Sequence, residues 1–330
     1  MSKYHIYGLG AALVDTEIDV SDSDLTNLGI DKGLMTLVDR ERQEAIMQSL
    51  DGHLVHAKQA SGGSAANSII AATYFGSSTF YSCKVADDAL GEFYMNDLRA
   101  AGVDADYSQK STEGVTGTCL VMITPDAERS MNTYLGISET LSTAELNEAA
   151  LADSEYLYME GYLVTSPTGR AAAIRAREVA EQNGVKTALS FSDPGMVEFF
   201  RDGLQEMLGN GVDMVFCNEE EALGWAQSRS LDEAVAALKK VAKTFAITLG
   251  AKGALVFDGH ELIEIAPRQV KAIDSNGAGD MFAGAFLYAI TAGKSFAEAG
   301  RLASQSAAEV VSHYGPRLPA ARHGELLAAL

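Results

Sequence analysis

The residues best suited to chemistry lie in DSNGAGDMFAGAF at 274–286, where an acid, Asp280, follows a glycine turn that leads into an apolar helix. The turn consists of Gly277, Ala278 and Gly279. Successive backbone N–H groups of such a turn can point at one spot, and the positive end of the helix dipole adds to them, so the pattern predicts an anion site. Asp280 could simply cap the helix, but two polar residues before the turn can do that. Beside a site of developing negative charge, an acid can act as the general base of phosphoryl transfer to an alcohol.

A second glycine turn, SGGSAAN at 61–67, also leads into an apolar helix. Its glycines, Gly62 and Gly63, let the backbone approach a ligand closely. Ser64 and Asn67 offer polar groups at the same helix start. The residues alone equally allow a tight strand-to-helix turn in which small side chains serve close packing.

Two other glycine patterns do not form nucleotide-binding loops. GKS at 293–295 matches the end of a Walker A loop, but Tyr288 stands where that loop needs its first glycine. GLG at 8–10 follows a predicted strand, but the third glycine of a dinucleotide fingerprint would fall at Leu13, and the residues after it are strand-like. A Rossmann dehydrogenase is therefore not expected.

Length and composition indicate an ordinary globular protein. The 330 residues suffice for one large α/β domain with a smaller attachment, and 47% of them are hydrophobic. The formal net charge of −20 repels nucleic-acid backbones, so no DNA or RNA partner is expected. Three cysteines at spacings that match no metal motif favour a reducing cytoplasm over a disulfide framework. No apolar run approaches the roughly 20 residues of a membrane span, and no signal peptide is recognised, so no membrane partner is expected.

Alternating strands and helices must position the two turns. From about residue 53 onward, short apolar runs alternate with amphipathic helical runs. This alternation predicts a three-layer αβα sandwich with a mostly parallel central sheet. The predicted strands are Leu54–Gln59, Thr79–Val85, Tyr156–Met159, Lys186–Ser190, Met214–Cys217, Phe245–Leu249 and Ala254–Asp258. Helix starts are predicted at Ser142 with Glu145, Ser230 with Glu233, Ser295 with Glu298, and Ser166 before Pro167.

Two segments break this alternation. Residues 11–38 hold two strand-like runs with room for only a short helix between them, and residues 115–135 indicate strand, turn and strand. We interpret them as a small antiparallel β-sheet that stands on the main domain as a lid. The large domain then comprises about residues 1–10, 39–114 and 136–330.

Four motifs, taken in order, resemble those of the ribokinase-like, or PfkB, family of carbohydrate and nucleoside kinases. GGSAAN at 62–67 is similar to the family's amino-terminal signature, and the stretch at 274–286 to its carboxy-terminal one. NEEE at 218–221 resembles the family's Asn-x-x-Glu motif, and TLGAKG at 248–253 resembles its nucleotide loop. The motifs span nearly the whole chain, so the resemblance implies the family's αβα sandwich with a small β lid. Within the family, the resemblance is strongest to adenosine kinases.

For the acceptor, the resemblance implies that Asp15 holds ribose hydroxyls and that Asp280 is the base on the primary hydroxyl. An acid on a strand can instead be a solvated edge residue, which is the alternative for Asp15. Asn276 stands where adenosine kinases typically have asparagine and ribokinases more often threonine. The sugar cradle would include Gly62, Gly63, Ser64 and Asn67. Walls for a base could come from Leu34, Met35, Cys119, Tyr134, Tyr162 and Leu163, with Cys119 as an apolar wall residue and not a nucleophile.

For the phosphates, the resemblance implies that the Gly277–Gly279 turn is the anion hole and that Arg129 approaches when the lid closes. The alternative for Arg129 is a surface ion pair with Glu128. ATP would lie along Asn218, Thr248, Gly250 and Gly253. Asn218 and Glu221 would position Mg²⁺ through water, although the helix dipole alone also favours an acid at position 221. A monovalent cation such as K⁺ could bind near Asp274.

The resemblance thus implies ATP-dependent phosphorylation of the primary 5′-hydroxyl of a nucleoside by in-line transfer, with adenosine to AMP as the first expectation. A sugar kinase acting on ribose, fructose or a related carbohydrate remains an alternative, and the base pocket would distinguish the two. A second alternative is a nucleoside-binding sensor that has lost catalysis, which the intact Asp280 and glycine turn argue against. A monomer and a homodimer are both compatible with the sequence.

Overall fold

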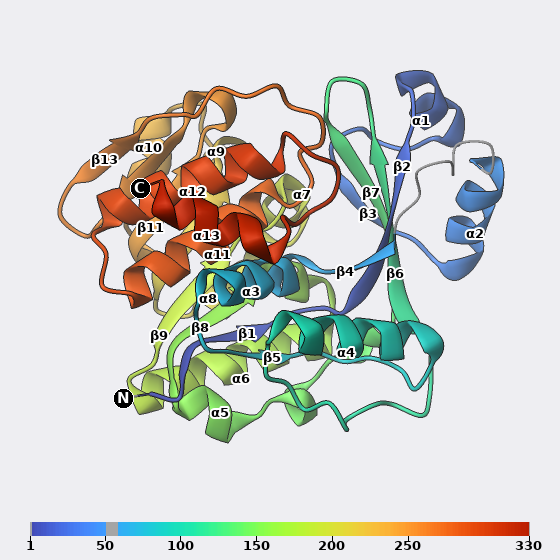
Figure 1. The fold of residues 1–330 in the computed structure, drawn as a ribbon, viewed down its shortest axis with the longest axis horizontal. Helices are drawn as coiled ribbons and strands as arrows, with labels where there is room; N and C mark the ends of the chain where they lie inside the picture. The colour runs from blue at the N-terminus through green and yellow to red at the C-terminus, as the bar shows by residue number, and fades with distance from the viewer. Residues whose placement is uncertain (1, 51–58, 330) are drawn as a thin grey trace.

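The computed structural model describes residues 2–50 and 59–329, and an eight-stranded sheet lies at the centre of this part of the chain (Figure 1). Its strands are β1 (Tyr4–Leu9), β5 (Thr79–Ser82), β8 (Ser154–Glu160), β9 (Lys186–Ser190), β10 (Val212–Asn218), β11 (Ala242–Thr248), β12 (Ala254–Phe257) and β13 (Leu262–Ile265). Their order is β13-β12-β11-β10-β9-β8-β1-β5. Neighbours from β11 to β5 are parallel, and β12 and β13 add an antiparallel edge. The predicted mostly parallel sheet is confirmed.

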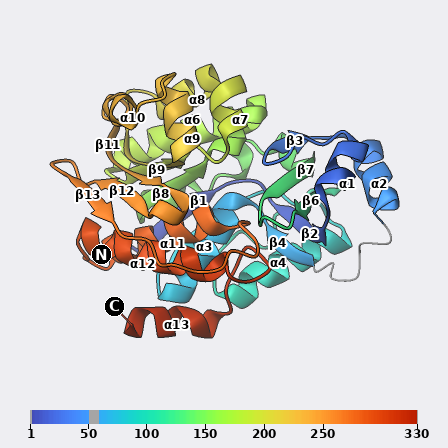
Figure 2. The same cartoon turned by 90° about the horizontal axis from the view of Figure 1, so that it is seen from above.

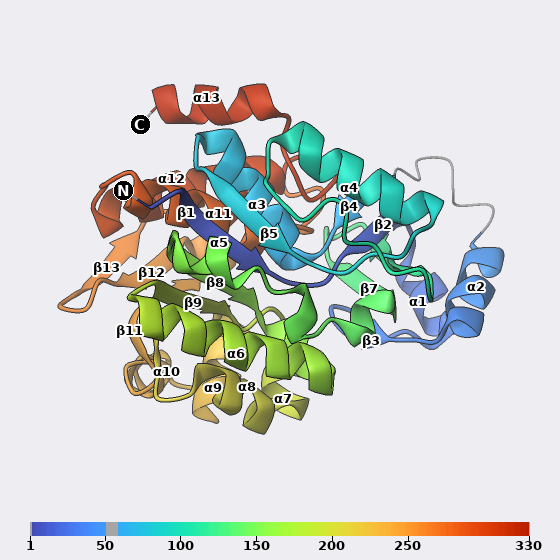
Figure 3. The ribbon, with the colours of Figure 1, turned by 90° about the horizontal axis from the view of Figure 1, so that it is seen from below.

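Helices cover both faces of this sheet, because successive strand residues point to opposite faces and both faces are apolar. In β8, Leu157 and Met159 pack into one hydrophobic cluster, whereas Tyr158 between them packs into the other. One face is covered by α3 (Ser64–Phe75), α4 (Ala89–Ala101), α11 (Ala278–Thr291), α12 (Phe296–Val310) and α13 (Ala320–Ala328), and the other by α5 (Glu148–Ala152), α6 (Pro167–Asn183), α7 (Pro194–Phe199), α8 (Arg201–Leu208), α9 (Glu219–Ala226) and α10 (Leu231–Leu238). Figures 2 and 3 show the two helical layers, which confirm the αβα sandwich.

A second, smaller sheet stands beside the large one. Its strands, in spatial order, are β3 (Met35–Leu37), β7 (Arg129–Gly136), β6 (Thr116–Ile123), β2 (Leu13–Asp19) and β4 (Gln59–Gly62). The predicted strand, turn and strand at 115–135 form the antiparallel pair β6–β7. However, β2 runs parallel to β6 and β3 parallel to β7, so the sheet is mixed and not purely antiparallel. The predicted strand Leu54–Gln59 lies outside the described residues except for Gln59, which begins β4.

Helices α1 (Asp22–Leu28) and α2 (Arg40–Ser49) cover the outer face of the small sheet (Figure 1). Leu25 of α1 and Ile46 of α2 pack in one apolar cluster with Leu120 and Met122 of β6. A capping box starts α1 just before Leu25. Helix α2 and strand β4 therefore belong with the small sheet. The sequence had instead predicted that residues 39–114 belong to the large domain. The amphipathic pattern of α2 predicts a helix but does not indicate which sheet it packs on.

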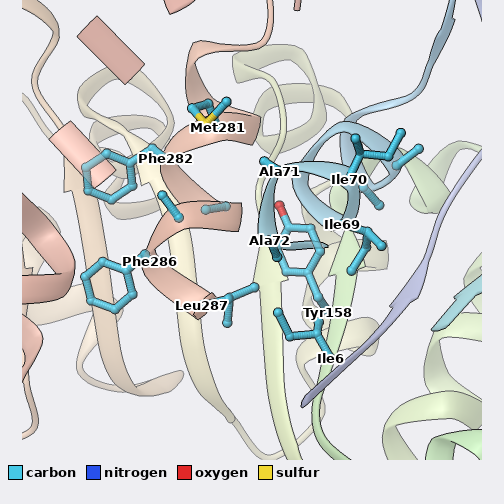
Figure 4. Close-up of a cluster of buried hydrophobic side chains, with 14 of the residues drawn as sticks. Ile6, Ile69, Ile70, Ala71, Ala72, Tyr158, Met281, Phe282, Phe286 and Leu287 are labelled. Atoms are coloured by element: carbon cyan, nitrogen blue, oxygen red, sulfur yellow. The ribbon is translucent and has the colours of Figure 1, made fainter. Parts of the chain in front are cut away.

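Helices α3 and α11 lie side by side on the large sheet (Figure 4). Ile69 and Ile70 of α3 belong to the same apolar cluster as Phe282 and Phe286 of α11. Gly284 permits the close approach, since a Cβ there would collide with the backbone of α3. The packing of these two helices sets their amino-terminal ends next to each other.

Most of the predicted helix starts are capped as expected. Capping boxes form at Ser142 with Glu145 and at Ser295 with Glu298, and Ser166 caps α6 before Pro167. At the fourth, Ser230 accepts the Glu233 N–H, but the Glu233 carboxylate accepts a hydrogen bond from Ser228 and does not close the box. None of the helices in the described ranges is long and apolar enough to span a membrane.

Candidate active site

A cavity of about 520 Å³ opens where the carboxyl ends of the large sheet's strands meet the small sheet. Glu160, Asn218 and Thr248, the last residues of β8, β10 and β11, line it. Ligands of open α/β sheets bind at this edge. The cavity is also lined by most of the predicted site residues, namely Asp15, Gly63, Ser64, Asn67, Cys119, Arg129, Glu221, Gly250, Asn276, Gly277, Ala278, Gly279 and Asp280.

Asp280 lies in the first turn of α11, and side chains of another helix hold its carboxylate. The Ser64 hydroxyl donates to Oδ1 at 2.6 Å, and Asn67 Nδ2 donates to Oδ2 at 3.0 Å. Burial raises the pKa of Asp280 above its usual value, while these two hydrogen bonds and the nearby Arg129 act in the opposite direction. The N-cap residue of α11 is Gly277, and no side chain caps the helix among the described residues. Asp280 therefore faces the cavity as an oriented carboxylate and not as a helix cap.

The turn before Asp280 offers backbone donors to the cavity. Gly277 has a φ of +75°, and a Cβ there would collide with Pro316, so only glycine fits. The Ala278 N–H donates to the Ser275 carbonyl oxygen at 3.3 Å. Within the described part of the chain, the Gly277 and Gly279 N–H groups have no acceptor. Of the three backbone donors predicted for the anion hole, Gly277 and Gly279 remain available, whereas the Ala278 N–H is used within the turn.

Asp15 of β2 is a buried acid at the cavity wall. It is 6% exposed, and its carboxylate has no hydrogen-bond partner among the described residues. Burial and the neighbouring Glu17 raise the pKa of Asp15 to about 8, with Arg317 acting in the opposite direction. Gly62 of β4 leaves the space that the Asp15 carboxylate fills, since a Cβ at Gly62 would collide with it. An acid in this setting is suited to bind ligand hydroxyl groups.

Most of the apolar side chains on the cavity face of the small sheet stand on β3, β6 and β7, beside the polar Arg129 and Thr133 of β7. Asp15 of β2 pairs with Cys119 of β6, which pairs with Thr133 of β7. The apolar residues of this sheet that line the cavity are Leu13, Met35, Leu37, Cys119, Met131 and Leu135. Apart from Leu13, they stand on β6, β7 and β3. One face thus presents a buried acid beside a largely apolar wall.

Arg129, the first residue of β7, faces the same cavity. The Glu128 carboxylate accepts the backbone N–H of Arg129 at 3.0 Å, and among the described residues no carboxylate forms an ion pair with the guanidinium. Burial lowers the pKa of Arg129, but the electrostatic influence of the nearby Tyr162, Asp193 and Asp280 outweighs it, so the pKa is raised. The predicted alternative, an ion pair with Glu128, is therefore absent, and the guanidinium is available to an anion.

The glycine turn contacts the β6–β7 hairpin. The Ser275 N–H donates to the Ala127 carbonyl oxygen at 3.1 Å, and Asn276 Nδ2 donates to Glu17 Oε1 at 3.4 Å. The buried Asp274 carboxylate accepts the Asn276 N–H at 2.8 Å and a second backbone N–H at 2.9 Å. The glycine turn is thus tied to the small sheet as well as to its own helix.

Comparison with known proteins adds an independent observation to this geometry. The family model described as pfkB family carbohydrate kinase matches residues 30–322. The chain belongs to the pfkB family. It is therefore a kinase, an ATP-dependent phosphotransferase, as the resemblance implied.

Relatives of this pfkB-family kinase cover its whole length. It is 30% identical to adenosine kinase of Schizophyllum commune over 96% of this chain and 97% of that protein. The crystal structure of adenosine kinase from Sinorhizobium meliloti matches it with a TM-score of 0.95 and 33% identity, and a probable sugar kinase from Rhizobium etli matches with 0.92 and 31%, each over 100% of both chains. The resemblance inferred from the motifs is confirmed.

The predicted nucleotide side of this pfkB-family kinase begins at Asn218, which caps α9. Its backbone N–H and Nδ2 donate to the two oxygens of Glu221 at 3.0 and 2.7 Å, and the Glu221 N–H returns a bond to Asn218 Oδ1 at 2.8 Å. Thr248 and Gly250 line the cavity. Gly253 does not. It has a φ of +96°, and a Cβ there would collide with Ile265, so its role is to shape the turn between β11 and β12.

The residues on the nucleotide side fit a Mg²⁺ ion that is held mainly by substrate phosphates and water. Asn218 occupies both oxygens of Glu221, and burial raises the pKa of Glu221 to about 8. No group of three or more His, Cys, Asp or Glu that could hold a metal occurs among the described residues. Mg²⁺ retains several waters and usually binds through one or two carboxylates together with substrate phosphates. Glu221 therefore fits contact with Mg²⁺ through water and not direct ligation.

Sequence reasoning missed Glu160 and misplaced Leu163. Glu160 is 1% exposed and lines the cavity, and its signal was an acid at the end of an otherwise apolar strand. Leu163 lies in a 3₁₀ turn (Gly161–Thr165), where Tyr162 reaches the cavity and Leu163 packs into the apolar core. Of the other predicted wall residues, Met35 and Cys119 line the cavity, whereas Leu34 and Tyr134 do not.

Proposed function

We propose that this kinase transfers the γ-phosphoryl group of ATP to the primary 5′-hydroxyl of a nucleoside, and that adenosine, which gives AMP, is its preferred acceptor. The observation that carries the proposal is the inner face of the small sheet. There, Asp15, which has no hydrogen-bond partner within residues 2–50 and 59–329, stands beside the apolar wall. A nucleoside has hydroxyl groups at one end and a flat base at the other, so it matches both parts of this face. A free sugar matches only the first. The adenosine kinase relatives support the same acceptor.

In the proposed reaction, Asp15 accepts hydrogen bonds from the ribose hydroxyls. Gly62 leaves the space for the Asp15 carboxylate, and Gly63 lines the cavity beside the sugar. Asp280, oriented by Ser64 and Asn67, takes the proton of the 5′-hydroxyl as that oxygen attacks the γ-phosphorus. The bond between the γ-phosphorus and the bridging oxygen breaks, and ADP leaves.

The backbone N–H groups of the glycine turn and the guanidinium of Arg129 stabilise the charge of the transferring group. ATP lies along Asn218, Thr248 and Gly250 in this proposal. Asn218 and Glu221 would hold Mg²⁺ through water, and the metal would supply neutralisation of phosphate charge.

A sugar kinase is the second candidate, and the likeness to the probable sugar kinase from Rhizobium etli favours it. A panel of adenosine, inosine, guanosine, ribose and fructose, with ATP and Mg²⁺ and ADP release as the measurement, separates the two. We expect the highest kcat/KM with adenosine. Faster turnover of free ribose or fructose would overturn the nucleoside proposal, and adenosine binding in a calorimeter without ADP release would favour a sensor.

The proposed base is tested by Asp280→Asn. Loss of a general base lowers kcat by about 10²–10⁴-fold. The variant keeps the size of the side chain and can still accept the Ser64 bond, so we expect acceptor binding to persist while turnover falls. Isothermal calorimetry with adenosine, alongside the ADP assay, measures both. Near-normal turnover in this variant would show that Asp280 is not the base.

A further inference from the structure

Glu160, at the carboxyl end of β8, holds two backbone segments with one buried carboxylate. The Ala11 N–H donates to Oε1 at 2.7 Å, and the Ala65 N–H donates to Oε2 at 2.8 Å. Among the described residues, no cation forms an ion pair with this carboxylate. Both of its oxygens are therefore engaged by backbone that is distant in the sequence.

The two segments lead to the two halves of the proposed acceptor site. Ala11 joins β1 to β2, and β2 carries Asp15. Ala65 lies in the first turn of α3, directly after Ser64. That turn supplies both hydrogen bonds to Asp280. One carboxylate thus connects the strand of the hydroxyl-binding acid to the helix turn that orients the proposed base.

The packing around this carboxylate leaves little freedom for movement. A Cβ at Gly10 would lie 2.6 Å from Glu160 Oε2 and 2.7 Å from the Ala65 Cβ, so the chain passes the carboxylate as closely as glycine allows. The Tyr81 hydroxyl donates to the Ala11 carbonyl oxygen at 3.1 Å and holds the same junction from the other side. A shift of Glu160 would therefore be passed to both segments.

Burial of this acid is unfavourable in itself. Burial raises the pKa of Glu160 to about 7, while the hydrogen bonds from Ala11 and Ala65 act in the opposite direction. An apolar residue of similar size would fill the space without a desolvation penalty. What it could not do is accept the two N–H groups.

We propose that Glu160 is a positioning residue for phosphoryl transfer. By accepting the Ala11 and Ala65 N–H groups, it fixes the first turn of α3 against the β1–β2 junction, and so the side chains that orient Asp280. The inference rests on the proposed role of Asp280 as the base.

The test begins with Glu160→Gln, whose amide group can satisfy only one of the two N–H donors. We expect kcat for adenosine to fall by about 10- to 100-fold, because small displacements of a reacting group reduce turnover strongly. KM for adenosine should rise by less than kcat falls: the lost contact at Ala11 affects the strand of Asp15, whereas the lost contact at Ala65 acts on the transition state and lowers kcat and kcat/KM together. A rise in KM with unchanged kcat would mean that Glu160 contacts the acceptor, and would overturn the proposal.

A double-variant cycle with Ser64→Ala measures whether the effect passes through α3. If Glu160 acts by positioning Ser64, the loss of kcat in Glu160→Gln/Ser64→Ala is smaller than the product of the two single losses. Two losses that multiply independently would contradict the proposal. Should Glu160→Gln fail to fold, Glu160→Asp enters the same cycle, because it retains the charge but is too short to span both N–H groups.

Two controls distinguish a positioning role of Glu160 from a general loss of stability and from an error in the proposed base. Glu145→Gln alters another buried carboxylate, which does not line the cavity and which accepts the Ser142 N–H at 2.8 Å. We expect this substitution to lower the melting temperature but not kcat. Asp280→Asn is assayed in parallel. If Asp280→Asn is inactive while Glu160→Gln turns over normally, only the positioning role is wrong. If Asp280→Asn is active, the proposed base itself is wrong.

Discussion

At the scale of single residues, the orientation of Asp280 comes from a neighbouring helix. Its two carboxylate oxygens are held by Ser64 and Asn67 of α3, and not by the N–H groups of its own helix. A carboxylate fixed in this way loses little freedom when an alcohol arrives, which favours proton transfer in one geometry. The hydrogen bonds also stabilise its charged form against burial.

Removal of the Ser64 hydroxyl should move the pH dependence of turnover. A hydrogen bond to the ionised form lowers a pKa, so Ser64→Ala raises the pKa of Asp280 further above its usual value. A base works only when deprotonated, so the acid limb of the kcat/KM profile shifts to higher pH. The measurement is the pH profile with adenosine and ATP. An unmoved acid limb would argue against Asp280 as the titrating group.

Ser68→Ala is the matched control for this shift. Ser68 lies one turn further along α3, and its hydroxyl bonds the Ser64 carbonyl oxygen and the Tyr158 hydroxyl, both at 3.2 Å. It does not contact Asp280, so we expect the acid limb to stay where it is in the wild type.

Asp280 and Glu160 also show which residues a sequence can reveal. Asp280 was predictable because the glycine turn that gives it meaning lies directly before it. Glu160 was not, because its two hydrogen bonds reach residues 149 and 95 positions away. The sequence shows an acid after an apolar strand, but only the folded chain shows what that acid binds.

At the scale of elements, the pairing of β2 with β4 sets the space around Asp15. Gly62 of β4 stands opposite Leu13, and its missing side chain leaves the space that Asp15 fills. Gly62→Ala should displace the Asp15 carboxylate. A hydrogen bond to a charged group contributes about 1.5–3 kcal/mol, so we expect KM for adenosine to rise on the order of 10-fold or more.

Gly324→Ala is the control for this substitution, since a Cβ at Gly324 meets nothing within 4 Å. Steady-state kinetics with circular dichroism of both variants make the comparison. A folded Gly62→Ala protein with the wild-type KM would show that Asp15 does not bind the acceptor.

The positions of β2, β3, β6 and β7 in the small sheet were predictable, but that of β4 and the parallel strand directions were not. An apolar run at 115–123 predicts a strand with the same pattern whether its neighbour is parallel or antiparallel. The turn at Pro125 fixes the direction of β7 against β6, because a short hairpin allows only antiparallel pairing. β2 and β6 are joined through nearly a hundred residues, so nothing local sets their parallel pairing.

At the scale of the whole molecule, three buried acids make the free energy of unfolding depend on pH. The pKa is raised to about 8 for Asp15, to about 7 for Glu160 and to about 8 for Glu221, with burial as the largest cause in each. Between the ordinary carboxyl pKa near 4 and these values, the folded protein binds more protons than the unfolded chain. The free energy of unfolding therefore falls as pH rises from about 4 to 8 through these three groups.

The melting temperature of the protein without substrates should accordingly be higher at pH 6 than at pH 8.5. The net charge of −20 adds repulsion in the same direction. Differential scanning calorimetry across this range makes the measurement. Asp15→Asn removes one of the three titrations, so its melting temperature should depend less steeply on pH. An equal slope in both proteins would show that Asp15 titrates in its ordinary range.

The location of most of the apolar wall on three strands of the small sheet has a consequence for engineering. The acid and its glycine neighbour stand on β2 and β4, whereas most of the apolar wall stands on β6, β7 and β3. Under the proposed function, substitutions at Met35, Met131 and Leu135 would change which bases fit, without altering the groups proposed to hold the sugar or take the proton. A small library at these three positions would extend the range of acceptors to nucleoside analogues.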